Sequence, residues 1–325
     1  MSDLDQLSSL ADSRQRLSQA IATRVIGQTP AVEAVLTAIF AGGHALLIGV
    51  PGLAKTMLVK TIADALGWQH RRIQFTPDLM PADITGTDIL REDRASGERH
   101  LAFLPGPVFG NIILADEINR APPKTQAALL EAMQEGAVTV GGRTYPLPAP
   151  FFVLATQNPI EQEGTYPLPE AQLDRFLVAV PIDYPLEADE RAIAALDTRV
   201  RTTVAPVLDI PAFQALSSLV ARIPVPAPVV DYAVRLVRAS RPLEGASAFV
   251  RENVAWGAGP RASQALVAVA RARAALAGLP AVGSAEIHAV APLVLRHRIV
   301  PSFQAAGAGI DGRAIVEHLL AQVRP

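Results

Sequence analysis

The segment Gly49–Thr56, with the sequence GVPGLAKT, constrains the fold of this chain more than any other feature. It follows the short apolar run Ala45–Ile48 and leads into a helical pattern over Lys55–Leu66. A glycine-rich turn between a buried strand and a helix directs backbone N–H groups at a phosphate, beside the positive end of the helix. Lys55 adds positive charge, and the Thr56 hydroxyl suits a magnesium ion. The segment therefore predicts a loop that binds the β and γ phosphates of a nucleotide.

One position of this loop departs from the strict pattern GxxxxGK[ST], because Ala54 stands where the glycine before the lysine is expected. The alternative interpretation is an ordinary turn between a strand and a helix, with an exposed lysine. The strand–loop–helix context and the motifs described below favour the phosphate loop. The positions expected to contact the nucleotide are Gly49, Pro51, Gly52, Leu53, Ala54, Lys55, Thr56 and Met57.

Five short apolar runs, spaced along the first part of the chain, predict the strands of a parallel sheet buried on both faces. The runs are Ala45–Ile48, Ile73–Phe75, Ile112–Ala115, Phe151–Ala155 and Phe176–Val180. Helical patterns over Lys55–Leu66 and Lys124–Glu135 lie between them, so strand and helix alternate as in a doubly wound α/β domain. We place this domain at residues 1–185, including a lead-in of two predicted helices, at residues 3–23 and about 31–41, before the first strand.

Two insertions and a change in composition complete the predicted organisation. Residues 86–105 carry a charged tip, and residues 138–145 alternate β-formers around a Gly-Gly pair, so both segments predict projecting hairpins. After Pro185 the sequence becomes alanine-rich and helical in pattern, with prolines between the helices and no further buried strand. Residues 186–325 are therefore expected to form a smaller, all-α domain.

Polar side chains follow two of the predicted strands. Asp116 and Glu117 end an apolar strand, where a buried carboxylate requires a partner or a metal. We expect Asp116 to hold the magnesium shell and Glu117 to orient and deprotonate the attacking water; the alternative is that both acids cap the next helix. Asn158 ends the strand that begins at Phe151 and is expected to bind the γ phosphate and the water, although an Asn-Pro pair is by itself often only a turn.

Two arginines are candidates for contacts with phosphate. Arg261 lies in the first turn of a predicted helix that starts at Gly259–Pro260, where a cation opposes the helix dipole unless an anion is bound there. A solvated surface arginine is the alternative. Arg175 precedes the fifth strand at the edge of the domain, from where it could reach the γ phosphate bound by a neighbouring subunit.

Composition limits the binding partners, the cellular location and the membrane spans that can be expected of this chain. The 325 residues carry a formal charge of −2, which gives no general attraction to nucleic acid or anionic lipid. The absence of cysteine removes disulfides and thiolate sites and suits a reducing compartment, so a cytoplasmic location is expected. The acidic N-terminus does not resemble a secretory signal, and the apolar stretches 34–50 and 262–282 are interrupted by charged or polar residues, as in core elements and unlike membrane spans.

The segments GVPGLAKT, ILADEINRAPPKTQAALLEAMQE, LATQNP, LPEAQLDRF and GPRAS, in this order, resemble the MoxR family of AAA+ ATPases over nearly the whole chain. The resemblance implies a P-loop AAA+ core with helix-2-insert and pre-sensor hairpins, an α-helical lid, and ATP with Mg²⁺ as ligands. It also implies Walker B residues Asp116 and Glu117, sensor 1 at Asn158, an arginine finger at Arg175 and sensor 2 at Arg261. Adenine would lie against Val25, Ile26 and Gly27.

The same resemblance implies a hexameric ring that acts as a chaperone-like remodeller of a client protein or metalloenzyme, with a partner that carries a von Willebrand factor A domain. One rival function is a DNA translocase that grips the strand with its hairpins. The arginines of these hairpins are Arg91, Arg94, Arg99 and Arg143, and the acids Glu92, Asp93 and Glu98 lie among them. Few aromatic residues that could stack on bases accompany them, so nucleic acid is an unlikely partner. A second rival is a nucleotide-gated scaffold without useful turnover, against which Glu117 argues.

Overall fold

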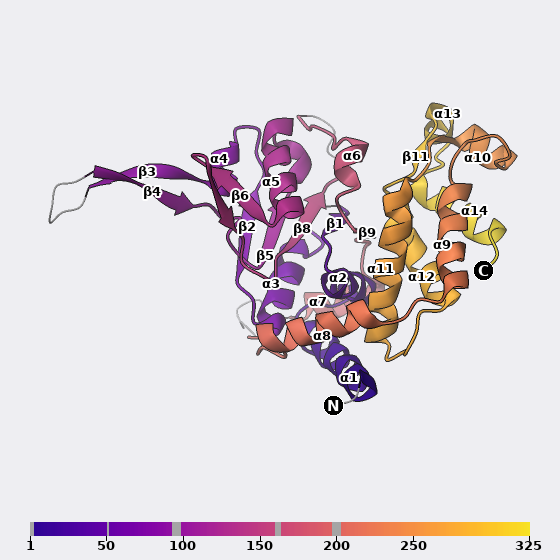
Figure 1. Cartoon of the computed structure of the whole chain (residues 1–325), viewed down its shortest axis with the longest axis horizontal. Helices are drawn as coiled ribbons and strands as arrows, with labels where there is room; N and C mark the ends of the chain where they lie inside the picture. The colour runs from indigo at the N-terminus through magenta and orange to yellow at the C-terminus, as the bar shows by residue number, and fades with distance from the viewer. Residues whose placement is uncertain (1–2, 51, 93–98, 160–163, 197–202) are drawn as a thin grey trace.

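The computed structural model describes residues 3–50, 52–92, 99–159, 164–196 and 203–325. An α/β core lies beside a helical lid, and a long two-stranded hairpin projects from the core on the side away from the lid (Figure 1). The lead-in helices are α1 (Asp3–Ala22) and α2 (Thr29–Phe40). Both precede the first strand, and α1 contacts the lid as well as the core.

The core holds one five-stranded parallel sheet, as predicted. In spatial order its strands are β2 (His70–Gln74), β5 (Ile112–Asp116), β8 (Phe152–Gln157), β1 (Ala45–Ile48) and β9 (Val178–Pro181). Because all five strands run the same way, their carboxyl ends meet at one edge of the sheet and their amino ends at the other. This polarity determines which side chains can meet in one site.

Strand β2 differs from its prediction, since it begins at His70 and not at Ile73. It is an edge strand, and Ile73 is its only fully buried residue. The polar stretch His70–Arg72 carries no hydrophobic signal, so sequence periodicity finds only the end of this strand.

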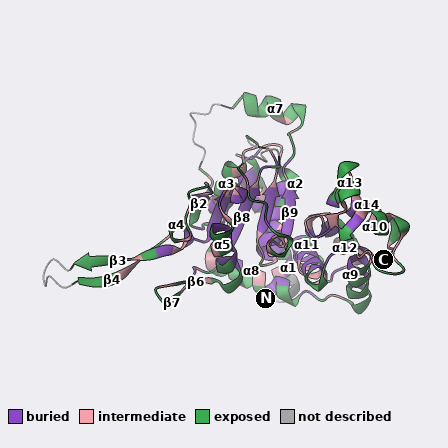
Figure 2. Cartoon of the chain, turned by 90° about the horizontal axis from the view of Figure 1, so that it is seen from above, coloured by how far each residue is buried: buried purple, intermediate pink, exposed green. Residues whose placement is uncertain are grey.

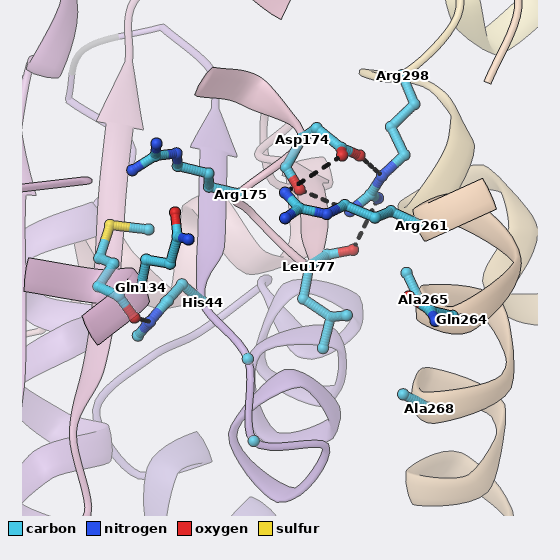
Figure 3. A pocket seen from close by; sticks show the side chains of 13 residues that line it. His44, Gln134, Asp174, Arg175, Leu177, Arg261, Gln264, Ala265, Ala268 and Arg298 are labelled. Carbon is cyan, nitrogen blue, oxygen red and sulfur yellow. Dashed lines mark hydrogen bonds and ion pairs between the residues drawn. The ribbon is translucent and has the colours of Figure 1, made fainter. Parts of the chain in front are cut away.

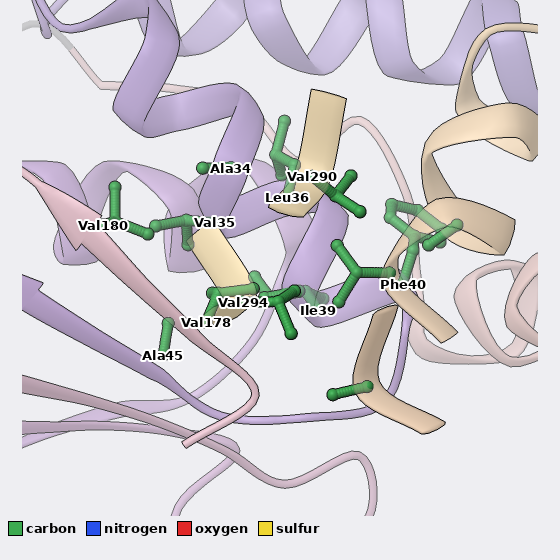
Figure 4. Packing of buried hydrophobic residues seen from close by; sticks show 14 of the residues in the cluster. Ala34, Val35, Leu36, Ile39, Phe40, Ala45, Val178, Val180, Val290 and Val294 are labelled. Atoms are coloured by element: carbon green, nitrogen blue, oxygen red, sulfur yellow. The ribbon is translucent and has the colours of Figure 1, made fainter. Parts of the chain in front are cut away.

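Alternate residues of the inner strands enter two hydrophobic clusters, one on each face of the sheet. Leu47 and Leu154 belong to the cluster shared with α1, α2, α3 (Lys55–Leu66) and the lid. Leu46 and Val153 belong to the cluster shared with α5 (Pro123–Glu135). Figure 4 shows how α2 and the lid helix α12 (Ser284–Leu295) bring their apolar side chains together over β9.

The two predicted hairpins are present. The first comprises β3 (Gly86–Glu92) and β4 (Arg99–Pro105) after the short helix α4 (Pro81–Thr85), and its tip lies outside the described residues. The second comprises β6 (Ala137–Val140) and β7 (Arg143–Pro146). Both glycines between β6 and β7 have positive φ, 56° and 78°, as a two-residue hairpin turn requires. Phe103 of the first hairpin stacks on Tyr145 of the second, with ring centroids 4.0 Å apart.

The lid is helical, with one element that the sequence does not predict. Its helices are α8 (Ile210–Arg222), α9 (Ala227–Ala239), α10 (Ala248–Asn253), α11 (Pro260–Leu276), α12, α13 (Phe303–Gly307) and α14 (Gly312–Gln322). An antiparallel pair, β10 (Val254–Trp256) and β11 (Val300–Pro301), corrects the expectation of an all-α domain. Strands of three and two residues are too short to leave a periodic signal.

Three short elements connect these parts: η1 (Ile118–Arg120), α6 (Glu170–Leu173) and α7 (Glu187–Ala194). A division of the chain at residue 185 remains a prediction, because one buried cluster continues from α1 and α2 into the lid. Within the described ranges, no single helix is both long and apolar enough to cross a membrane; α8 and α9 meet that criterion only as a pair, bent by 88°.

His44, just before β1, connects three elements of the core. Its Nδ1 accepts a hydrogen bond from the Val153 backbone N–H at 3.0 Å, and its Nε2 lies 3.1 Å from the Met133 carbonyl oxygen. Burial lowers the pKa of His44 from 6.5 to about 4, although the Met133 carbonyl opposes this change. The folded protein therefore holds His44 neutral, with Nε2 as the donor.

The low pKa of His44 predicts a specific loss of stability in acid. Because the folded pKa lies below the unfolded value, the contribution of His44 is complete above pH 6.5 and decreases as the pH falls toward 4, by on the order of 3 kcal/mol. Urea unfolding of the wild type and of His44→Gln between pH 7 and pH 4 tests this. The variant should lose less stability on acidification, because other titrating groups are common to both proteins. An identical pH dependence in the two proteins would contradict the prediction.

Candidate nucleotide-binding and hydrolysis site

A cleft of about 420 Å³ lies at the carboxyl edge of the sheet. The loop after β1 and the ends of β5 and β8 form it, so three strands that are separate in sequence supply its walls. The residues that line it are Gly52, Ala54, Lys55, Thr56, Met57, Asp116, Glu117, Thr156 and Asn158. The structure thus brings together most of the residues predicted for phosphate binding and hydrolysis.

The loop and the first turn of α3 fit an anion. Ala54 is the N-cap residue of α3 and makes no side-chain capping bond, and the first turn contains no acidic residue. The N–H groups at this helix end therefore have no capping side chain, and the helix dipole favours negative charge there. Gly52 has a φ of 84°, which favours glycine, and the space beside its Cα is open. Pro51, also predicted to contact the nucleotide, lies outside the described residues.

Lys55 supplies a cation inside the cleft. Its Nζ donates a hydrogen bond to the Gly49 carbonyl oxygen, which holds the side chain back along the loop. Desolvation lowers the pKa of Lys55, while the charges of Asp116 and Glu117 oppose this change. Gly49 has no room for a side chain, because a Cβ there would lie 2.5 Å from the Ile182 carbonyl oxygen.

Asp116, at the end of β5, is held by two neighbouring strands. Its Oδ1 accepts a hydrogen bond of 2.7 Å from the Thr156 hydroxyl of β8. Its Oδ2 accepts from Nε and Nη2 of Arg72 on β2, at 3.2 and 2.7 Å. The Thr56 hydroxyl and the Asp116 carboxylate are the hard oxygen donors that Mg²⁺ prefers, and Mg²⁺ commonly takes its other ligands from water and substrate phosphates. These residues fit the magnesium ion that the phosphate loop implies.

Glu117 is the next residue and has a different set of partners. Its backbone N–H donates to the Thr156 hydroxyl at 2.8 Å, so Thr156 bridges the two acids. Its Oε2 accepts hydrogen bonds from Gln74 Nε2 at 2.9 Å and from Arg120 Nη1 at 3.1 Å. The carboxylate is therefore positioned by both a neighbouring strand and the turn that follows it.

Backbone strain marks the same cleft. Among the described residues, Ala54 and Glu117 are the only non-glycine residues with positive φ, at 54° and 56°. Each such conformation costs about 1–2 kcal/mol for an L-residue. Both of these residues line the cleft, so the strain in this part of the chain coincides with the predicted site.

Four residues of this network were not predicted from the sequence: Arg72, Gln74, Arg120 and Thr156. Thr156 is buried and lies in an otherwise apolar strand, where a threonine is ordinary. Arg72 belongs to the polar stretch His70–Arg72, which has no strand signal, and Gln74 lies within the predicted run Ile73–Phe75 as its polar member. The pairing of β2 with β5 brings them to the acids, and that pairing has no local sequence signature.

Arg175 and Arg261 lie together at the opposite, amino edge of the sheet (Figure 3). They line a cavity of about 380 Å³ with residues 42–44, which precede β1. Arg175 Nη1 donates to the Leu130 carbonyl oxygen at 2.8 Å, and Arg261 Nη1 lies 4.0 Å from Asp174 Oδ2. The phosphate loop follows β1, so the length of the strand separates both arginines from the loop of their own chain. This structure does not place Arg261 where it would contact a nucleotide bound to the same chain.

The segment expected near adenine lies beside the root of the phosphate loop. Gly27 packs against Pro185 and Asp189, in the segment that follows β9. That segment touches the loop, because Ile182 N–H donates to the Ile48 carbonyl oxygen at 2.8 Å. Val25 is buried in the core, and Ile26 is half-buried. The adenine contacts of these residues remain a prediction.

Comparison with known proteins agrees with this architecture. The family described as "ATPase family associated with various cellular activities (AAA)" matches residues 44–178, and the AAA lid domain matches residues 246–319. A crystal structure of a candidate ATPase from Cytophaga hutchinsonii superposes with a TM-score of 0.87 at 37% identity, covering 98% of this chain and 97% of that one. The fold and the cleft define an AAA-type ATPase with a helical lid.

Three relatives indicate which family of AAA-type ATPases includes this chain. Chaperone MoxR1 of Mycobacterium tuberculosis is 45% identical over 92% of this chain and 78% of its own. The uncharacterized protein YeaC of Bacillus subtilis is 42% identical over 92% and 91%, and protein MoxR of Methylorubrum extorquens 34% over 89% and 88%. The chain belongs to the MoxR family of AAA+ ATPases and hydrolyses ATP.

The bridging position of Thr156 generates a prediction. Thr156→Val keeps the shape of the side chain but removes the hydroxyl that bonds Asp116 Oδ1 and the Glu117 N–H. We expect kcat for ATP hydrolysis to fall about tenfold, equivalent to ~1.4 kcal/mol, with little change in ATP affinity. Steady-state kinetics and calorimetric titration measure the two quantities. Thr139→Val on the exposed hairpin is the control, and an unchanged kcat in Thr156→Val would contradict the positioning role.

Proposed function

We propose that this protein is a magnesium-dependent ATPase that works as a hexameric ring, in which each active site is shared between two neighbouring copies. The observation that carries the proposal is the convergence of the phosphate loop, Asp116, Glu117 and Asn158 on one cleft at the carboxyl edge of the sheet. The separate position of two arginines at the other edge supports the sharing of sites.

Each residue of the cleft has a role in this proposal. The loop N–H groups and Lys55 bind the β and γ phosphates, and Thr56 and Asp116 hold the magnesium ion, which neutralises phosphate charge when bound. Glu117 orients a water molecule and accepts its proton. Asn158, buried at the rim, orients the γ phosphate and the water. Thr156 fixes the relative position of the two acids.

Arg175 and Arg261 complete the site of the next copy. Both arginines lie at the amino edge of their own sheet, a strand length away from any phosphate bound by the loop of the same chain. The Arg261 side chain is 64% exposed. An arginine that reaches the γ phosphate from outside stabilises the charge of the transition state. A head-to-tail interface, which joins two different surfaces, closes into a ring when the rotation between copies permits it.

The proposed task of the ring is chaperone-like remodelling of a client protein or metalloenzyme in the cytoplasm, together with a partner that carries a von Willebrand factor A domain. The name of the Mycobacterium relative, a chaperone, supports this task. The first hairpin also supports it, because Leu90 and Leu101 form a cross-strand pair with 62% and 67% of their surfaces exposed. Exposed apolar pairs on a projecting element suit contact with another protein.

The described strands of the first hairpin, Gly86–Glu92 and Arg99–Pro105, offer little to a DNA strand. Arg99 forms an ion pair with Glu92 at 3.0 Å, so its charge is partly neutralised within the hairpin. Phe103 stacks on Tyr145 near the base, where it serves packing between the two hairpins. We therefore do not propose nucleic-acid translocation.

Glu117→Gln tests the assignment of the base. The variant should bind Mg-ATP with nearly unchanged affinity, because the phosphate loop is intact, and its single-turnover hydrolysis rate should fall at least ~100-fold. Calorimetry and single-turnover kinetics measure the two quantities, and Glu131→Gln, at an exposed position of α5, is the matched control. Full single-turnover activity in Glu117→Gln would exclude Glu117 as the base.

Arg175→Ala tests the sharing of sites. This variant alone should lose on the order of 1,000-fold in kcat. Mixed with Glu117→Gln it should regain activity, because the intact Glu117 of one copy then meets the intact Arg175 of the next. A chain with both substitutions, mixed with Arg175→Ala, is the control and should regain none. Absence of complementation, or wild-type specific activity that stays constant down to monomer concentrations, would overturn the shared site.

A further inference from the structure

Arg72 belongs to the exposed edge strand β2, yet its charge is directed at the carboxylate of Asp116. In β2 the first three residues, His70, Arg71 and Arg72, are exposed, whereas β8 and β9 are buried over most of their length (Figure 2). Successive side chains of a strand point to opposite faces of the sheet. The Arg71 side chain accordingly lies beside Gly110, while Arg72 turns toward the end of β5. Arg72 therefore reaches the acid from the outer side of the sheet.

Two donors of Arg72 converge on one oxygen of Asp116. Nε lies 3.2 Å and Nη2 lies 2.7 Å from Oδ2. Nη2 also donates to the side-chain carbonyl oxygen of Gln74, two residues along the same strand. Three bonds fix the plane of the guanidinium, and hydrogen bonds to an ionised group are roughly twice as strong as those between neutral groups. Arg72 thus holds Oδ2 toward the outermost strand of the sheet.

The other oxygen of Asp116 is held from the opposite side. Oδ1 accepts the Thr156 hydroxyl at 2.7 Å. In the sheet, β2 and β8 flank β5 on its two sides, and β1 with the phosphate loop lies beyond β8. Thr156 and Thr56 both line the cleft together with Asp116. The carboxylate is therefore stretched between two strands, with Oδ1 on the side of the loop and of the Thr56 hydroxyl.

Arg72 has two opposing effects on a metal ion held by Asp116. Its positive charge repels the ion, but the Arg72 side chain is 51% exposed, so water and salt screen much of that repulsion. Its two bonds fix the direction of the carboxylate, and partners that orient a metal ligand are typically worth roughly 10–100-fold in metal affinity or activity. Since orientation acts at contact distance and the repulsion is screened, we expect the first to exceed the second.

We propose that Arg72 is a positioning residue for the metal site: by drawing Oδ2 of Asp116 to β2, it presents Oδ1 to the cleft on the side of Thr56. The inference rests on the magnesium site of the proposed function and extends that site to a residue of the edge strand. The bond to Gln74 serves the same purpose, because it fixes the guanidinium that holds the acid. The geometry of the guanidinium, and not its charge alone, is what the site uses.

Binding of Mn²⁺ in the presence of ADP, followed by the electron paramagnetic resonance signal of the free ion, tests this role without hydrolysis. Mn²⁺ takes the same oxygen ligands as Mg²⁺. Arg72→Lys keeps the charge but loses the planar fork, so it should bind Mn²⁺ at least ~5-fold more weakly than the wild type. Arg71→Lys, the neighbouring exposed position, is the matched control and should bind Mn²⁺ as the wild type does. ADP affinity in EDTA should be equal in all three proteins; a parallel loss of ADP affinity in Arg72→Lys would overturn the proposal.

Two further variants distinguish the possible failures. Arg72→Gln loses both the charge and the fork and should also bind Mn²⁺ more weakly than the wild type. Wild-type affinity in Arg72→Lys, together with tighter binding in Arg72→Gln, would show that Arg72 only balances charge and would overturn the proposal. Asp116→Asn should lose most of the Mn²⁺ binding. If it binds Mn²⁺ as the wild type does, the magnesium assignment and this inference both fail; if it loses binding but Arg72→Lys does not, the magnesium site stands and only the role of Arg72 is wrong.

Discussion

The ion pair between Asp174 and Arg298 fixes how the lid sits on the core. Arg298 has only 4% of its side chain exposed, and its Nε donates to Asp174 Oδ1 at 2.7 Å. Its other donors bond backbone carbonyl oxygens of Phe176, Leu177 and Val294, so the guanidinium joins the start of β9 to helix α12. Burial lowers the pKa of Arg298 and Asp174 opposes this change. A buried guanidinium left without this carboxylate would be strongly unfavourable.

This joint determines which groups share an edge of the sheet. Asp174 also lies 4.0 Å from Arg261, and Arg175 follows it directly, so the lid and the amino end of β9 present their cations together. The phosphate loop and the two acids occupy the carboxyl edge. A parallel sheet keeps these two sets of groups apart by the length of its strands, and this separation is the physical basis of our proposal that the site is divided between copies.

The sequence predicts those features that depend on local pattern. β1 and α3 appear at the predicted residues, because an apolar run, a glycine turn and a helical pattern follow one another without interruption. Features that depend on pairing across the fold were missed. Arg72 and Gln74 reach the acids only through the β2–β5 register, and the position of Arg261 depends on the lid joint at Arg298. Neither relation is encoded within a window of neighbouring residues.

The left-handed backbone at Ala54 has a consequence for the binding step itself. Glycine at this position would be free to sample many conformations before a ligand arrives, and that freedom would be lost on binding. Alanine has fewer accessible conformations, so more of the ordering entropy is spent when the chain folds and less when a ligand binds. A small sacrifice of folding stability thus keeps the loop preorganised between turnovers. Substitutions in the cleft that relax the backbone are accordingly expected to raise the stability of the fold and to reduce the preorganisation of the loop for its ligand.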